Sequence, residues 1–349
     1  RFDYYCWDLY AKVGDFYEAD PDRKALQAET LHAIEKGAGD TARLGAYVAA
    51  RIVECHLATM ARLDIRYDLL AHESDILHLH FWDRAFELLK ERGAIRHETE
   101  GKNAGCWVLP MDDDDKIIVR SNGTVTYTGK DIAYQLWKLG RLDLDFRYHR
   151  HRSNSDGHEL WTTTSDQGEP RPPRFGHADA VYNVIDVGQS YPQRVVKAGV
   201  AALGFEAEAD GSHHLAYEKV VLSPATARDL GYEVSEGDGA VKVSGRKGLG
   251  VKADDLLDAL LAKARAEVDA RDPERDPAAR EATAKAVATG ALRYFMLRFS
   301  RTRIITFDME EALAFTGETG PYVQNAVVRA RNILGKLEAQ GHGVEGLLE

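Results

Sequence analysis

The stretch AVYNVIDVGQSYPQRVVKAGVAALG, residues 180–204, decides the fold class. Its first part is a short apolar and β-branched run between two loops, which is typical of a buried strand. Its second part, residues 194–204, carries apolar residues three and four positions apart and ends at glycine, which is typical of a helix. A strand followed by a helix indicates an α/β layer with parallel strands.

The pattern on both sides of this stretch predicts further elements of the same kinds. We expect a short buried strand over residues 65–77, whose end opens onto a site, and an amphipathic helix over 80–93 that stops at Gly93. Period-two alternation over residues 105–127 predicts a strand, an acidic loop and a strand. The remaining predictions are helices over 130–139, 253–270, 283–300 and 321–340, and strands over 213–222 and 239–245.

Three other segments differ from this α/β pattern. Residues 23–63 contain no proline and read as two helices around a glycine-rich break. Residues 141–178 are polar and rich in His, Arg, Pro and Gly, so we expect a long surface excursion there. The last fifty or so residues read as all-α and separate from the α/β part.

Composition limits the classes of function. The chain has 349 residues, 44% of them hydrophobic, and a net charge of -11, which suits a soluble protein of two or three domains. No apolar run of about 18 residues predicts a membrane span. The three cysteines Cys6, Cys55 and Cys106 form no CxxC pair, so we expect neither a disulfide framework nor structural zinc, and a reducing cytoplasm fits.

Two further expectations come from the acidic pI and from the identity of the first residue. A pI near 5.7 argues against generic coating of nucleic acid, so a nucleic-acid partner must meet a local basic face. The chain begins with Arg1 and not with Met, and the residues that follow lack the basic, apolar and small segments of a secretory signal in that order. We therefore expect the chain to be part of a longer reading frame.

The first candidate for chemistry is VKVSGRKGLG, residues 241–250. Lys242, Arg246 and Lys247 surround Ser244 and three glycines. Glycines let backbone amides approach an anion, and cations offset the charge on a leaving phosphate. The alternative is a solvated basic turn, which is common.

The second candidate is a set of polar side chains that could hold a planar cation. Tyr127 is expected to end a strand and Asp131 to open a helix, four residues apart, and a guanidinium needs such acceptors. Asp131 could instead only cap that helix. Glu73, at the expected end of a buried strand, needs a matching cation unless it lies in an exposed loop. Gln189 follows the central strand and could line a polar pocket or begin a turn.

No metal site is predicted. The four aspartates at 112–115 point in different directions and suit a solvated loop. The paired histidines, such as His149 with His151, lack partners at zinc spacing.

Four blocks in order resemble a known family. They are residues 123–140, GTVTYTGKDIAYQLWKLG, and then 180–193, 241–258 and 291–334. Together they resemble the second half of arginyl-tRNA synthetase, a class I aminoacyl-tRNA synthetase. The likeness runs from about Asp64 to the end, and the first sixty-odd residues fit only loosely.

The resemblance implies an ATP- and Mg²⁺-dependent enzyme that joins L-arginine to tRNA(Arg). It places Glu73, Tyr127, Asp131 and Gln189 in the arginine pocket, which agrees with the chemical reading, because two carboxylates, a phenol and an amide suit a buried guanidinium. It also identifies the KMSKS-type loop that closes on ATP. The loop residues are Lys242, Val243, Ser244, Gly245, Arg246 and Lys247, with Lys242, Ser244, Arg246 and Lys247 in catalytic roles.

Two departures from the family pattern matter. Gly245 replaces the second lysine of the signature, and the missing cation could come from Arg246, Lys247 or an upstream residue. The HIGH motif is absent, and the terminal helical bundle stops short. We therefore expect the isolated chain not to activate arginine, and turnover in an ATP–pyrophosphate exchange assay would refute this.

The resemblance implies a Rossmann-type α/β catalytic domain, in its C-terminal half, followed by the start of an all-α anticodon-binding domain. Expected boundaries are a helical segment at 1–63, the catalytic part at 64–235, the signature loop and connecting helices at 236–300, and the anticodon-binding start at 301–349. We expect a cytoplasmic monomer with no DNA or membrane partner.

Two other readings remain open. One is a non-catalytic synthetase-like module that binds tRNA or a protein. The other is a different class I synthetase, such as one for cysteine, which would need zinc ligands that are not evident.

Overall fold

The computed structural model describes residues 1–112, 114–154, 156–232, 234 and 251–341. The chain has a mixed α/β fold and divides into two compact units. One unit is Tyr67–Glu218, and the other combines Arg1–Arg66 with Lys219–Glu349. Across the described residues, every helix is too short or too polar to cross a membrane.

The Tyr67–Glu218 unit combines short sheets with helices. Its helices are α4 (Glu73–His78), α5 (Phe81–Glu91), α6 (Tyr127–Lys138), α7 (Ser190–Ala202) and α8 (Glu206–Asp210), with 3-10 turns η1 (Gly101–Asn103) and η2 (Val187–Gln189). Its strands are β1 (Leu69–Leu70), β2 (Arg96–His97), β3 (Trp107–Leu109), β4 (Lys116–Val119), β5 (Arg147–Ser153), β6 (Glu159–Thr164), β7 (Val181–Asp186) and β8 (Ser212–Tyr217).

These strands form three sheets. The order β1-β6-β5 pairs β1 parallel and β5 antiparallel to β6, whereas β2-β3-β4 is antiparallel throughout. β7 and β8 pair in parallel, with α7 and α8 between them in the chain. The sequence prediction of parallel strands joined by helices is therefore confirmed for this pair.

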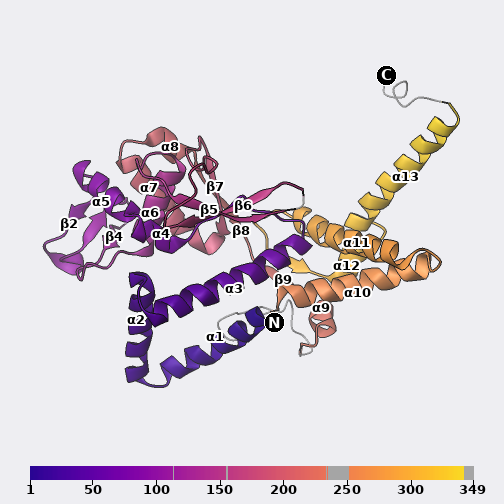
Figure 1. Ribbon diagram of the computed structural model, residues 1–349, viewed down its shortest axis with the longest axis horizontal. Helices are drawn as coiled ribbons and strands as arrows, with labels where there is room; N and C mark the ends of the chain where they lie inside the picture. Colours follow the sequence, from indigo (N-terminus) through magenta and orange to yellow (C-terminus); the bar gives the residue numbers. More distant parts are fainter. Residues whose placement is uncertain (113, 155, 233, 235–250, 342–349) are drawn as a thin grey trace. The chain divides into compact units, whose positions relative to one another are not determined.

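Helix α6 occupies the core of this unit. One side of it buries Ile132, Leu136 and Trp137. The helix packs beside α7, as Figure 1 shows, and Gly199 of α7 makes this approach possible because a Cβ there would lie 2.7 Å from a side-chain carbon of Ile132. The polar residues Asp131 and Lys138 lie on another side of α6 and are half-buried.

Three predicted elements differ in this unit. The strand expected over 65–77 is only two residues long, and α4 begins at Glu73. β7 is not fully buried, because Tyr182 and Val184 are each 62% exposed on a sheet of two strands. The expected excursion at 141–178 contains β5 and β6. Tyr148 of β5, which lies between Arg147 and His149, and Trp161 of β6 are buried in the core and hold these strands there.

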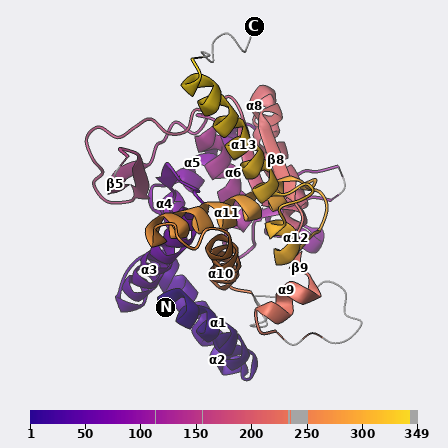
Figure 2. The ribbon, with the colours of Figure 1, turned by 90° about the vertical axis from the view of Figure 1, so that its right-hand side faces the viewer.

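The second unit is mainly helical. Its helices are α1 (Phe2–Glu18), α2 (Pro21–Lys36), α3 (Asp40–Arg62), α9 (Pro224–Asp229), α10 (Ala253–Arg271), α11 (Pro277–Leu297), α12 (Met309–Leu313) and α13 (Gly320–Ala339). Figure 2 shows α11 lying between α10 and α13. Leu260, Phe295 and Phe307 are among the side chains that fill its core.

The two helices expected over residues 23–63 are confirmed as α2 and α3, which Gly37 and Gly39 separate. A further helix, α1, precedes them, and Asp20 and Pro21 begin α2 directly after it. One expectation for this unit needs correction. The last fifty residues are not all-α: β10 (Ile305–Phe307) pairs in parallel with β9 (Val220–Leu222). This pairing joins segments about eighty residues apart, which local periodicity does not reveal.

Asp254, in the first turn of α10, holds α3 to α10. It is 4% exposed and accepts hydrogen bonds from Thr59 Oγ1 at 2.6 Å, from Arg62 and from Arg1. Burial of the carboxyl works against ionisation, but the hydrogen bonds from Arg1, Thr59 and Arg62 outweigh it and hold the pKa of Asp254 at about 2.

Candidate functional site

The four side chains predicted to bind a planar cation all lie in the Tyr67–Glu218 unit. Glu73 is the first residue of α4, Tyr127 is the first residue of α6, Asp131 lies one turn further along α6, and Gln189 ends η2. Glu73, Tyr127 and Gln189 are exposed and Asp131 is half-buried. The contacts of each side chain show which of the four lie close to one another.

The start of α6 is fixed to β4. Thr126 is the N-cap residue, its N–H donates to the carbonyl of Ile118 at 2.9 Å, and its hydroxyl donates to the same carbonyl at 3.1 Å. Tyr127 therefore begins the helix and does not end a strand. Asp131 lies within the helix, so the alternative that it caps α6 is wrong.

Close packing at Gly129 also fixes the first turn of α6. A Cβ at this position would lie 2.9 Å from Trp82 Cζ3 and 2.9 Å from Val125 Cγ1. Trp82 itself is buried. Only glycine allows the helix to approach so closely, and the positions of Tyr127 and Asp131 depend on that approach.

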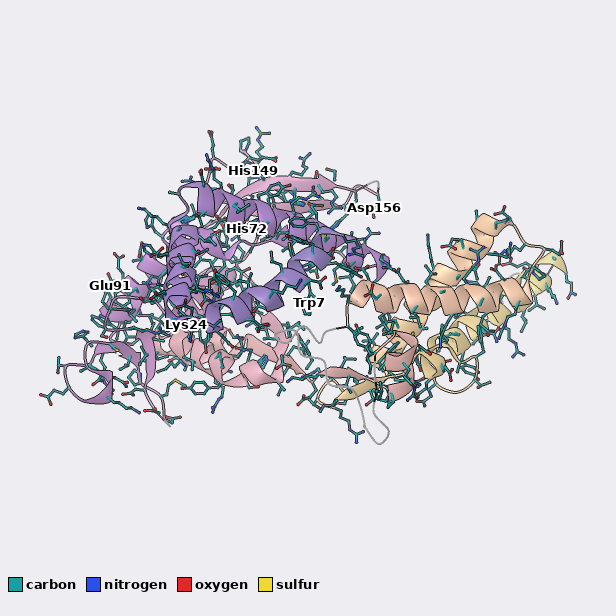
Figure 3. The ribbon with its side chains drawn as sticks, turned by 90° about the horizontal axis from the view of Figure 1, so that it is seen from below. Trp7, Lys24, His72, Glu91, His149 and Asp156 are labelled. Carbon is teal, nitrogen blue, oxygen red and sulfur yellow. The ribbon has the colours of Figure 1, made fainter. Side chains whose placement is uncertain are left out.

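A buried bond network positions the start of α4. The N–H of His72, which is labelled in Figure 3, donates to Thr163 Oγ1 at 2.8 Å, and that hydroxyl donates to Asp75 Oδ2 at 2.7 Å. Glu73 follows directly and leaves its carboxylate in solvent. Lys130 Nζ lies 3.6 Å from Glu73 Oε1, which brings α4 and α6 together.

Asp131 lies in an environment that disfavours its charge. Burial raises the pKa of Asp131, and the negative charge of Glu73 raises it further. Lys138 and Lys130 oppose this rise. Two acidic groups therefore lie close enough to repel each other, and an additional cation placed beside both would relieve that repulsion.

Lys138, the last residue of α6, lies on the same side of the helix as Asp131. Its Nζ donates to Asn183 Oδ1 on β7 at 2.9 Å and lies 4.3 Å from the ring centroid of Tyr134. Burial lowers the pKa of Lys138, and Asp131 opposes that effect. The ammonium is thus held in place by Asn183 and Tyr134, partly desolvated, on the side of α6 that carries Asp131.

Tyr127 and the segment after Gln189 share one cation. Lys116 Nζ, on β4, lies 5.9 Å from the ring centroid of Tyr127 and 5.1 Å from that of Tyr191. Gln189 itself is exposed, and its side chain forms no hydrogen bond with the residues that the structure describes. The structure therefore brings Glu73 and Asp131 together and links Tyr127 to Tyr191, but it leaves Gln189 unjoined to the other three.

The neighbouring cations and the amide that holds one of them are not predicted from the sequence. Helical spacing offers a signal for Lys138, because residues 127, 131, 134 and 138 follow the i, i+4, i+7, i+11 pattern of one helix side. Nothing in the sequence pairs Asn183 with Lys138, since 45 residues separate them.

The predicted ATP loop cannot be described in the same way. Lys242, Val243, Ser244, Gly245, Arg246 and Lys247 lie outside the described residues, as does the strand expected over 239–245. Within the described residues, no group of three or more His, Cys, Asp or Glu side chains could hold a metal ion.

The chain is similar to arginine–tRNA ligases over almost its whole length. No protein-family model matches the chain. The arginine–tRNA ligase of Thermococcus kodakarensis is 36% identical over 342 residues, and that of Thermus thermophilus is 38% identical over 347 residues. These alignments cover 95% and 96% of this chain but only 50% and 53% of the relatives. The chain corresponds to about half of an arginyl-tRNA synthetase.

The solved structure of Thermus thermophilus arginyl-tRNA synthetase agrees with this assignment. It matches with a TM-score of 0.74 at 36% identity over 91% of this chain and 50% of that protein. The similarity to arginyl-tRNA synthetases also extends into the N-terminal helices, where the resemblance in the sequence is loose.

Proposed function

We propose that this chain is the part of an arginyl-tRNA synthetase that recognises the arginine side chain. In the whole enzyme it would serve the ATP-dependent activation of L-arginine and its transfer to tRNA(Arg). The observation that carries the proposal is the pair of acidic side chains, Glu73 and Asp131, on adjacent helices in one unit.

Charge complementarity is the physical basis of this recognition. A guanidinium is planar, always positively charged and rich in N–H donors, so it suits a site with two carboxylates. Binding would remove the repulsion between Glu73 and Asp131, because the ligand supplies a positive charge between them. The exposed phenol of Tyr127, one helical turn from Asp131, offers a further acceptor or a ring face.

Gln189 has the weakest support of the four residues. Its exposed side chain at the end of η2 could hydrogen-bond to the polar main-chain groups of an amino acid. Asp186 accepts the N–H of Gly188 at 2.7 Å and thereby fixes the turn that carries Gln189.

The activation step would use ATP as a substrate, with Mg²⁺ bound to it, and tRNA(Arg) as the acceptor. The residues proposed to bind ATP are those of the signature loop, Lys242, Val243, Ser244, Gly245, Arg246 and Lys247. The catalytic cations among them would offset charge as pyrophosphate leaves. We also propose a cytoplasmic, monomeric enzyme without DNA or membrane partners.

The architecture proposed for these roles has two parts. The Tyr67–Glu218 unit would be the second half of a Rossmann-type catalytic domain, which the parallel pairing of β7 and β8 through α7 supports. The helices α12 and α13 would begin an anticodon-binding domain. The boundaries at 63, 235 and 300 remain part of the proposal.

Direct binding of L-arginine tests the proposal. We expect isothermal titration calorimetry to detect binding to the chain and to show at least a tenfold loss in Asp131→Asn, which keeps the size of the side chain and removes its charge. Asp143→Asn is the matched control, because this exposed aspartate lies on the loop after α6. Equal affinities of the wild type and Asp131→Asn would refute the assignment.

A further inference from the structure

The side of α6 that bears Asp131 also carries a half-buried cation that the proposed recognition step does not use. Lys138 lies two helical turns from Asp131 on this side, with Tyr134 between them. Its ammonium is fixed by Asn183 and by the ring of Tyr134, at 2.9 Å and 4.3 Å. A lysine ammonium normally lies in water, and holding it away from water is costly. A fixed lysine of this kind therefore suggests a specific role.

The fixation of Lys138 extends through a hydrogen-bond network. Asn183 Nδ2 donates to Gln193 Oε1 at 2.9 Å on α7 and to Gln135 Oε1 at 3.3 Å. Gln135 is 2% exposed and donates to Ser212 Oγ on β8 at 2.9 Å. Asn183 must therefore present its oxygen to Lys138, because its amide nitrogen already serves two acceptors.

The charges around Asp131 come from two helices. Glu73 on α4 repels the carboxylate, whereas Lys130 and Lys138 on α6 attract it. Lys130 is engaged with Glu73 at 3.6 Å, so its charge is shared with the other carboxylate. Among the described residues, Lys138 has no carboxylate within salt-bridge distance. Its positive charge nevertheless lowers the pKa of Asp131, which lies on the same side of the helix.

We propose that Lys138 is a positioning residue of the arginine site, a fixed internal cation that holds Asp131 as a carboxylate before arginine arrives. This inference rests on the proposed function. It adds to the acidic pair a residue that acts on Asp131 without contacting the ligand. The geometry suits that role, because the ammonium is anchored too far from Asp131 to occupy its acceptor sites, which stay available to a guanidinium.

A purely structural role for Lys138 would be to tie α6 to β7 through Asn183. Two variants separate the alternatives. Lys138→Gln removes the charge and keeps an N–H donor for Asn183, whereas Asn183→Ala removes the acceptor and keeps the charge. Both variants are checked for folding by far-UV circular dichroism and thermal unfolding, and Lys138→Arg restores the charge if Lys138→Gln does not fold.

The experiment is a pH titration of the Asp131 carboxyl carbon by NMR in the full chain labelled with carbon-13 aspartate, the signal being assigned by its loss in Asp131→Asn. We expect the midpoint to move upward in Lys138→Gln and to remain near the wild-type value in Asn183→Ala and Lys138→Arg. An unchanged midpoint in folded Lys138→Gln, or a higher midpoint in Lys138→Arg, would overturn the proposal.

Arginine binding provides the second readout. By calorimetry, the affinity of Lys138→Gln for L-arginine should fall below that of the wild type as the pH decreases, and the two should converge as the pH increases. A pH-independent ratio would contradict the proposed role. Absence of L-arginine binding by the wild type would refute the proposed function but leave the NMR test of Lys138 intact, so the two failures can be distinguished.

Discussion

Asp131 and Lys138 lie two turns apart on one side of α6, and each opposes the effect of burial on the pKa of the other. Glu73 adds a second negative charge from α4. The site therefore holds opposite charges on a rigid helix, which is the arrangement that a charged ligand can recognise without large rearrangement.

Arginine affinity should decrease on acidification at a higher pH than an ordinary aspartate would dictate. Burial and Glu73 raise the pKa of Asp131, so its carboxylate becomes protonated at a pH above the ordinary aspartate pKa of 3.8. Calorimetric titrations with L-arginine from pH 8 to pH 4 measure this. An affinity that stays constant down to about pH 4 would contradict the assignment of Asp131.

Asp131→Asn should stabilise the fold at neutral pH while it weakens arginine binding. Because the pKa of Asp131 is higher in the folded than in the unfolded chain, the folded chain holds the proton to higher pH, and stability falls as pH rises through that window. The asparagine avoids this cost. Differential scanning calorimetry should give a higher Tm for the variant at pH 7.5 and a smaller difference near pH 4.

A lower Tm of Asp131→Asn at pH 7.5 would show that the carboxylate makes a net stabilising interaction in the free protein. Asp131 would then belong to the structure of α6 and not to a ligand site. The measurement of Tm thus complements that of affinity.

Gly129→Ala should disturb the site through packing alone. The added methyl group would meet Trp82 and Val125 at 2.9 Å, and such overpacking costs about 1–3 kcal/mol. We expect a lower Tm together with weaker L-arginine binding, because the first turn of α6 must move. Gly14→Ala, in α1 with open space around the position, is the control and should keep both values or raise the Tm slightly.

Asp254→Asn should destabilise the Arg1–Arg66 and Lys219–Glu349 unit above about pH 4. The reduction of the pKa from 3.8 to about 2 corresponds to about 2 kcal/mol. This contribution is complete above the unfolded pKa and is lost as pH falls through about 2. Urea unfolding of both proteins at pH 7 and pH 3 measures the difference, which should shrink at the lower pH.

The control for that variant is Asp258→Asn. Asp258 also pairs with Arg62, at 2.6 Å, but its side chain is 69% exposed, so its loss should cost less than about 1 kcal/mol. If both variants lost equal stability, burial of Asp254 would not be the source of its effect.

The sequence predicts the helices of this protein better than its short strands and charge pairs. The apolar spacing of residues 130–139 and 253–270 is long and periodic, and α6 and α10 follow it. β1 has two residues and β10 has three, which is too short for a period to be detected. Their partners, β6 and β9, lie far away in the sequence.

For the candidate site too, some residues can be predicted from the sequence and others cannot. The chemistry of Glu73, Tyr127 and Asp131 can be inferred from residue type and order, and their proposed roles come from the resemblance to arginyl-tRNA synthetase. The cations beside them depend on tertiary packing. Lys138 contacts Asn183 because β7 lies beside α6 in the fold. The two residues are 45 positions apart in the sequence, so this pair can be recognised only in the folded chain.

The most direct test of the account is a comparison of two ligands that differ in charge. L-citrulline has almost the shape of L-arginine but a neutral head group. In calorimetric titrations of the chain at pH 7.5, we predict measurable binding of L-arginine and at least tenfold weaker binding of L-citrulline. Equal affinity for both, in a chain that binds L-arginine, would contradict recognition by Glu73 and Asp131.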